Sequence, residues 1–98
     1  MSSTKMGDER YALRMSAQAR RQLAEEIPTA VVFAAHEFIR GPLLGDPYRV
    51  GKRLRAPLEA CFSARMGTYR VIYAVDDARG IVEVVAVAAR SDAYRSNS

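Results

Sequence analysis

The sequence predicts an α+β domain in which an N-terminal strand and a helical hairpin pack on a mostly antiparallel four-stranded sheet. Two patterns support this prediction. Apolar residues recur at helical spacing in the first half of the chain, and from Ala60 onward they follow the period of strands. Glycine and proline are concentrated between the two halves, where they predict a loop.

The first elements are a strand and a helix. Residues 10–15 alternate weakly between polar and apolar side chains, as a strand with one buried face does. Ser16 then offers an N-cap for a helix over residues 17–26. Ile27 and Pro28 end this helix, because proline cannot continue it.

A second helix and a loop follow. Pro28 suits the first helical position, and apolar residues repeat at helical spacing until Gly41 and Pro42 end the helix. The two helices are expected to form a hairpin. Residues 41–57 hold three of the six glycines and three of the four prolines, which predicts a loop with a short extended piece at residues 50–54.

Three further strands complete the predicted sheet. Residues 61–66 and 69–75 alternate as strands do and are joined by a tight turn at residues 67–68. A second turn at residues 76–80 leads into a valine-rich strand over residues 81–90.

A chain of 98 residues has room for one core, so we expect a single domain over residues 10–95. Residues 1–9 are expected to be a disordered lead and residues 96–98 a short tail. The lead lacks the apolar segment of a signal peptide, and no apolar run is long enough to cross a bilayer. These features predict a cytoplasmic protein with no membrane partner.

The composition excludes several kinds of site. With one cysteine, Cys61, and one histidine, His36, the chain can build neither a cysteine metal cluster nor a pair of catalytic histidines. We therefore expect no metal and no cofactor. The net charge of +4 favours an anionic partner, either a nucleic acid or an acidic protein.

The arginines near the predicted hairpin are the candidates for function. Arg65 and Arg70 flank the turn, and strand alternation gives each a defined face. If these faces coincide and Arg90 and Arg95 lie nearby, several guanidinium groups surround one patch, which suits a bound phosphate. The alternative is a set of solvated arginines on the open face of a sheet, and composition alone favours that alternative.

Two segments carry a resemblance to a known family. The stretch GKRLRAPLEACFSARMGTYRVIYAVDD, followed by VAVAARSDAYR, resembles the RelE/ParE superfamily of toxins, and so does the N-terminal stretch YALRMSAQARRQLAEEIP. The resemblance covers nearly the whole chain. Its YRVIY element is typical of the superfamily and not of one activity within it.

The resemblance implies a RelE-like fold and the toxin of a type II toxin–antitoxin pair. In the RelE branch it implies an endoribonuclease that cuts messenger RNA in the ribosomal A site, by attack of a ribose 2′-hydroxyl on the adjacent phosphate. The implied partners are a RelB-like antitoxin, the ribosome and its messenger RNA, with operator DNA bound only through the antitoxin. The toxin alone is expected to be a monomer.

The resemblance also implies roles for single residues. Arg65, Arg70, Arg90 and Tyr94 match the catalytic residues of RelE. Arg70 and Arg90 would hold the scissile phosphate, Arg65 would stabilise charge, and Tyr94 would accept the 2′-hydroxyl proton or stack on a base. Ser63 departs from the pattern, because RelE carries a second lysine there.

A second basic group lies mostly in the loop before the hairpin. It comprises Lys52, Arg53 and Arg55, and in the C-terminal tail Arg95. The loop side chains suit contacts to ribosomal RNA phosphates, with a solvated loop as an equal alternative, and Arg95 is assigned to RNA or ribosome binding with them.

Two other functions stay open. A ParE-like chain would inhibit a type II topoisomerase and catalyse nothing, although such chains generally lack the arginine and tyrosine set around the last strand. A degenerate toxin would only bind its antitoxin and repress a shared promoter with it, and Ser63 keeps this alternative open.

Overall fold

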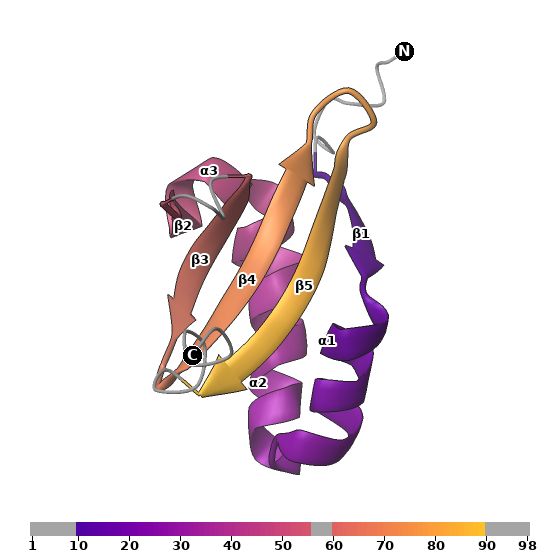
Figure 1. Cartoon of the computed structure of the whole chain (residues 1–98), viewed down its shortest axis with the longest axis vertical. Coiled ribbons are helices and arrows are strands. Elements are labelled where there is room, and N and C mark those ends of the chain that lie inside the picture. The colour runs from indigo at the N-terminus through magenta and orange to yellow at the C-terminus, as the bar shows by residue number, and fades with distance from the viewer. Residues whose placement is uncertain (1–9, 56–59, 90–98) are drawn as a thin grey trace.

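The computed structural model describes residues 10–55 and 60–89, which form one sheet with helices on one of its faces. Figure 1 shows the sheet in front and the helices α1 and α2 behind it, running in opposite directions. The predicted α+β class and the helical hairpin are confirmed. The predicted number of strands is wrong, because the sheet has five strands, in the order β1-β5-β4-β3-β2.

Strand β1 (Ala12–Met15) pairs in parallel with β5 (Ile81–Ala89) and leads into helix α1 (Ala17–Arg21). A π-helical turn, η2 (Gln22–Glu26), continues α1, so the helix spans the predicted residues. Ser16 is its N-cap as predicted, since its hydroxyl oxygen accepts a hydrogen bond from the Ala19 N–H at 3.0 Å.

The junction between β1 and α1 is fixed to β5. The Ser16 hydroxyl donates to the Val85 carbonyl at 2.7 Å, and the buried Gln22 side chain accepts a hydrogen bond from the Val87 N–H at 2.8 Å. Beyond the point where β1 ends, these two side chains form the hydrogen bonds that a neighbouring strand would otherwise form with the backbone of β5. This arrangement holds the helical layer against the sheet.

Helix α2 (Thr29–Phe38) does not end at Gly41 and Pro42, so the predicted end is wrong. The chain passes both residues in a second π-helical turn, η3 (Ile39–Leu43). A single π-helical turn of this kind is one way in which a helix accommodates an irregularity. Continuing the helix buries Ile39 and Leu43 completely, and that burial outweighs the local signal to stop.

The segment predicted as a loop contains two further elements. Helix α3 (Pro47–Val50) was not predicted, and it begins with proline at its first position. Strand β2 (Gly51–Arg53) is the predicted extended piece, and it pairs antiparallel with β3 (Cys61–Met66). The sheet gains its fifth strand from this short element.

Strands β3 and β4 (Tyr69–Asp76) form the predicted hairpin, and β4 pairs antiparallel with β5. Gly67 and Gly80 occupy the two predicted turns with φ of 64° and 68°, a conformation that favours glycine. The β4–β5 register shifts between Ile72 and Tyr73, which marks a β-bulge that the sequence did not predict.

The core lies between the sheet and the helices. Its fully buried side chains include Tyr73, Val71 and Val84 from the sheet and Ile39 from the helical layer. Val71 and Tyr73 therefore lie on the face of β4 that meets the helices. In the described part of the chain, no helix is long and apolar enough to span a membrane. The predicted lead at residues 1–9 and the tail lie outside the described residues.

Candidate functional site

Two of the predicted arginines meet on the face of the sheet that the helices leave uncovered, called here the open face. Arg65 on β3 and Arg70 on β4 are direct partners across the hairpin. Direct partners in an antiparallel pair point to the same face, so the condition stated from the sequence, that the two faces coincide, is met. Arg65 is exposed, whereas Arg70 is half-buried.

These arginines line a groove of about 510 Å³ that opens between β2, β3 and the end of α3. Four of the described residues that line it are basic, and none of the described lining residues is acidic. The basic residues are Arg49, Lys52, Arg65 and Arg70. Cations gathered along one groove repel one another, so the groove is suited to an anion that neutralises them.

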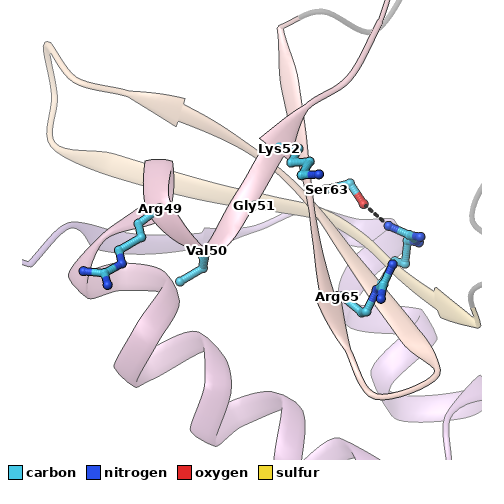
Figure 2. Close-up of a pocket in the computed structure, with 7 residues that line it drawn as sticks. Arg49, Val50, Gly51, Lys52, Ser63 and Arg65 are labelled. Atoms are coloured by element: carbon cyan, nitrogen blue, oxygen red, sulfur yellow. Dashed lines mark hydrogen bonds between the residues drawn. The ribbon is translucent and has the colours of Figure 1, made fainter.

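Ser63 lies at the floor of the groove. Its side chain is only 6% exposed, and the Arg70 Nη1 group donates a hydrogen bond to its hydroxyl oxygen at 3.4 Å. Figure 2 shows this bond as a dashed line, with Lys52, Ser63 and Arg65 gathered on one side and Arg49 apart from them. The serine therefore helps to orient Arg70 toward the others.

The structure separates Lys52 from Arg53. Lys52 is the direct partner of Ser63 and lines the groove. Arg53 points to the other face, where its guanidinium lies 4.9 Å from the centre of the Phe62 ring. Arg55 is exposed beyond the end of β2. Of these three predicted RNA-binding residues, only Lys52 joins Arg65 and Arg70.

Strand β2 is held in place by a close approach to the core. A side chain at Gly51 would collide with the Tyr73 hydroxyl and would come within 2.9 Å of the Ser63 carbonyl oxygen. The buried Tyr73 hydroxyl donates to the carbonyl of Pro47, the first residue of α3. Burial raises the pKa of Tyr73 to about 12, so it remains a neutral donor. These contacts fix the backbone that carries Lys52.

A second cluster of polar side chains, at the opposite end of β4, joins the residue before β1, helix α3 and the turn after β4. The hydroxyls of Tyr11 and Tyr48 each donate to one carboxylate oxygen of Asp77. The hydrogen bond to Asp77 raises the pKa of Tyr48 and, with burial, raises that of Tyr11 to about 12. The same two bonds lower the pKa of Asp77. We call this group the tyrosine–aspartate clamp.

The remaining predicted site residues, Arg90, Tyr94 and Arg95, lie outside the described residues. Arg49 was missed because its segment was predicted to be a loop, although it precedes Lys52 by three positions. Among the residues that the structure describes, no three histidine, cysteine, aspartate or glutamate side chains lie close enough to hold a metal ion.

Comparison with known proteins gives consistent matches over most of the chain. Residues 8–94 match the family described as the ParE toxin of type II toxin–antitoxin systems. Toxin RelE of Mycobacterium tuberculosis is 46% identical over 90 residues, which cover 92% of this chain and 92% of the relative. Toxin RelG of the same organism is 44% identical over 85 residues, which cover 87% of this chain and 97% of that toxin.

A solved structure shows the same fold. The toxin–antitoxin complex RelBE2 from Mycobacterium tuberculosis contains a chain that is 42% identical to this one, with a TM-score of 0.78. The match covers 83% of this chain and 99% of that chain. The resemblance stated from the sequence is therefore confirmed at the level of sequence and of fold.

Proposed function

The chain belongs to the RelE/ParE family of type II toxins, and from this premise we propose that it is an endoribonuclease that cuts messenger RNA in the ribosomal A site. The observation that carries the proposal is the pairing of Arg65 with Arg70 on the open face. Like charges placed directly opposite each other reduce the stability of a sheet. A bound phosphate offsets this repulsion, and an RNA backbone supplies one.

The proposed reaction is attack of a ribose 2′-hydroxyl on the neighbouring phosphorus, which releases the 5′-oxygen of the next nucleotide and leaves a cyclic phosphate. Arg70, oriented by Ser63, holds the nonbridging oxygens together with Arg90. Arg65 stabilises the charge that grows in the transition state. Loss of one such donor costs about a hundredfold or more in rate.

Two sequence assignments complete the proposed site. Tyr94 is proposed to accept the 2′-hydroxyl proton or to stack on a base. Arg53, Arg55 and Arg95 contact phosphates of ribosomal RNA, which position the toxin without reading sequence. The protein acts in the cytoplasm, where its substrate is found.

The proposed partner is a RelB-like antitoxin. The similar chain from Mycobacterium tuberculosis was solved in a toxin–antitoxin complex, which supports a partner of the same kind here. An acidic or amphipathic segment that folds on binding would neutralise the groove cations and block the RNA. The free toxin is proposed to be a monomer, and a light-scattering mass of twice the chain would contradict this.

Primer extension on a messenger RNA bound to programmed ribosomes tests the proposed activity. The wild type should give cuts in phase with the codons, and Arg70→Ala and Arg90→Ala should reduce them about a hundredfold or more. Absence of cuts from folded wild-type toxin overturns the proposal. The family description names ParE toxins, so inhibition of a type II topoisomerase is the alternative, which a supercoiling assay measures.

A further inference from the structure

The basic residues of the groove differ in their ability to transfer a proton. Lys52 is the only lysine among the described lining residues, and the other three cations are arginines. A guanidinium holds its proton to a pH above about 12, whereas an ammonium ordinarily has a pKa of about 10.4. The leaving 5′-oxygen of a cut RNA needs a proton, and lysine is the better donor of the two types.

We propose that Lys52 is a catalytic residue that protonates the leaving 5′-oxygen. This inference rests on the proposed RNA cleavage and assigns a step within it. The O2′–P bond forms as the P–O5′ bond breaks, and a proton passes from the Lys52 ammonium to O5′. The resulting amine regains its proton from water, and the 2′-hydroxyl proton passes to a base other than Lys52, which is water in the simplest case.

The position of Lys52 supports this assignment. It pairs directly with Ser63, and the Ser63 hydroxyl oxygen lies 3.4 Å from the Arg70 Nη1 atom. A phosphate held by Arg70 at the floor of the groove is therefore within reach of the Lys52 side chain. Ser63 is small and buried, so it leaves space for the longer side chain that faces it from β2.

The backbone around Lys52 is constrained, as the placement of a proton donor requires. Its neighbour Gly51 has no room for even one additional carbon atom, because the Tyr73 hydroxyl and the Ser63 carbonyl fill that space. On the other side, Arg53 is held over the Phe62 ring. Strand alternation then directs Lys52 to the open face, where Arg65 and Arg70 lie.

A substrate with sulfur in place of the 5′-bridging oxygen isolates this step. Thiolate is a good leaving group that needs no proton, so loss of a general acid does not slow its release. We would place either the natural linkage or the 5′-phosphorothiolate linkage at the cut site of a messenger RNA on programmed ribosomes. Single-turnover cleavage would be measured for the wild type, Lys52→Ala, Lys52→Arg and Arg70→Ala.

On the natural linkage, Lys52→Ala and Lys52→Arg should each cut about a hundredfold or more slowly than the wild type. On the sulfur linkage both Lys52 variants should approach the wild-type rate, whereas Arg70→Ala should remain slow on both substrates. Arg20→Ala, which removes an exposed positive charge from α1, is the matched control for net charge. Thermal melting of every variant verifies that the fold is retained.

Two results would overturn the assignment while leaving the proposed function intact. Lys52→Arg that cuts the natural linkage at the wild-type rate would show that charge alone is needed. Lys52→Ala that is equally slow on both linkages would show that the lysine only binds or positions the RNA. A wild type that cuts neither linkage would instead contradict the proposed function, and the assignment with it.

Discussion

Arg65 and Arg70 are direct partners across the β3–β4 hairpin, so two positive charges oppose each other on the open face of the sheet. Opposite charges at such positions would stabilise the sheet by about 0.2–1 kcal/mol, whereas like charges destabilise it. Taken by itself, this pairing of like charges works against the stability of the hairpin. Functional sites are the places where such local conflicts are expected.

Replacing Arg65 should raise stability while it lowers activity. Arg65→Ala removes the repulsion, and Arg65→Glu converts it into an attraction with Arg70, so the free energy of unfolding should increase in the order wild type, Ala, Glu. Each step should amount to about 0.2–1 kcal/mol, and cleavage of ribosome-bound messenger RNA should fall in the same order. Urea unfolding and primer extension measure the two effects.

Salt provides the control for this prediction. Because Arg65 is exposed, added salt should screen its interaction with Arg70 and reduce the differences among the three proteins. If both variants were less stable than the wild type at low and high salt alike, the aliphatic part of Arg65 would be packing against its neighbours. The like-charge explanation would then be wrong.

Ser63→Lys should not increase cleavage. Ser63 is 6% exposed and faces Lys52, so a lysine there would be crowded and would place two ammonium groups opposite each other. It would also lose the hydrogen bond to Arg70. We expect a loss of about 1–3 kcal/mol in the free energy of unfolding and no gain in activity.

Ser63→Ala is the matched control, because it removes the hydroxyl without adding bulk or charge. Its cost should be about 0.5–1.5 kcal/mol, as expected for one hydrogen bond. Primer extension on the same programmed ribosomes compares the variants with the wild type. Cleavage by Ser63→Lys where the wild type cuts nothing would instead identify this chain as a degenerate toxin.

Gly51→Ala should displace β2 and reduce both stability and cleavage. The added carbon would collide with the Tyr73 hydroxyl, which donates a hydrogen bond to Pro47. Forcing extra volume into such a site costs about 1–3 kcal/mol, and the displacement moves Lys52 out of the groove. Thermal melting and primer extension would be measured on the same preparations.

Gly41→Ala is the matched glycine control. A carbon added there meets no atom within 4 Å, and Gly41 lies in the helical turn η3, where alanine is favoured over glycine by about 0.5–1 kcal/mol. This variant should be as stable as the wild type or slightly more stable. A Gly51→Ala protein that melts at the wild-type temperature would refute the tight packing of β2 against Tyr73.

The hairpin and its two arginines could be predicted because their signals are local. The tight turn at Gly67 sets the register of β3 and β4, and alternation then assigns Arg65 and Arg70 to one face. The pairing of Lys52 with Ser63 could not be predicted. A long loop joins β2 to β3, and its length does not determine which residues of the two strands face each other. The strand order is non-local in the same way, because β1 joins the sheet beside β5.

The end of α2 illustrates a different limit. Glycine followed by proline is a strong local signal for the end of a helix, yet the chain continues through Gly41 and Pro42. Ile39 and Leu43 lie four positions apart on the buried side, and their burial depends on the whole sheet. Tertiary packing overrode local propensity here, and a single sequence contains no direct measure of that packing.

Asp77→Asn should lower stability near neutral pH. The Asp77 carboxylate accepts one hydrogen bond on each of its two charged oxygens, from Tyr11 and from Tyr48, whereas an amide has a single, uncharged oxygen. The folded-state pKa of Asp77 is lowered, so its stabilising effect is fully present above the unfolded-state value of about 3.9. It is lost as the pH falls through the lower folded-state pKa. The melting curves of the wild type and the variant should therefore converge in acid.

The tyrosine–aspartate clamp should also weaken in strong base. The pKa of Tyr11 is raised to about 12, so its contribution is complete below the unfolded-state value of about 10 and is lost as the pH rises through about 12. Asp76→Asn is the matched control, because Asp76 bears the same charge and forms an exposed ion pair with the Arg79 side chain and a hydrogen bond from the Arg79 backbone N–H. If the melting temperature of Asp77→Asn differed from that of the wild type by the same amount at every pH, the prediction would be wrong. The ionised carboxylate of Asp77 would then not be what stabilises the fold.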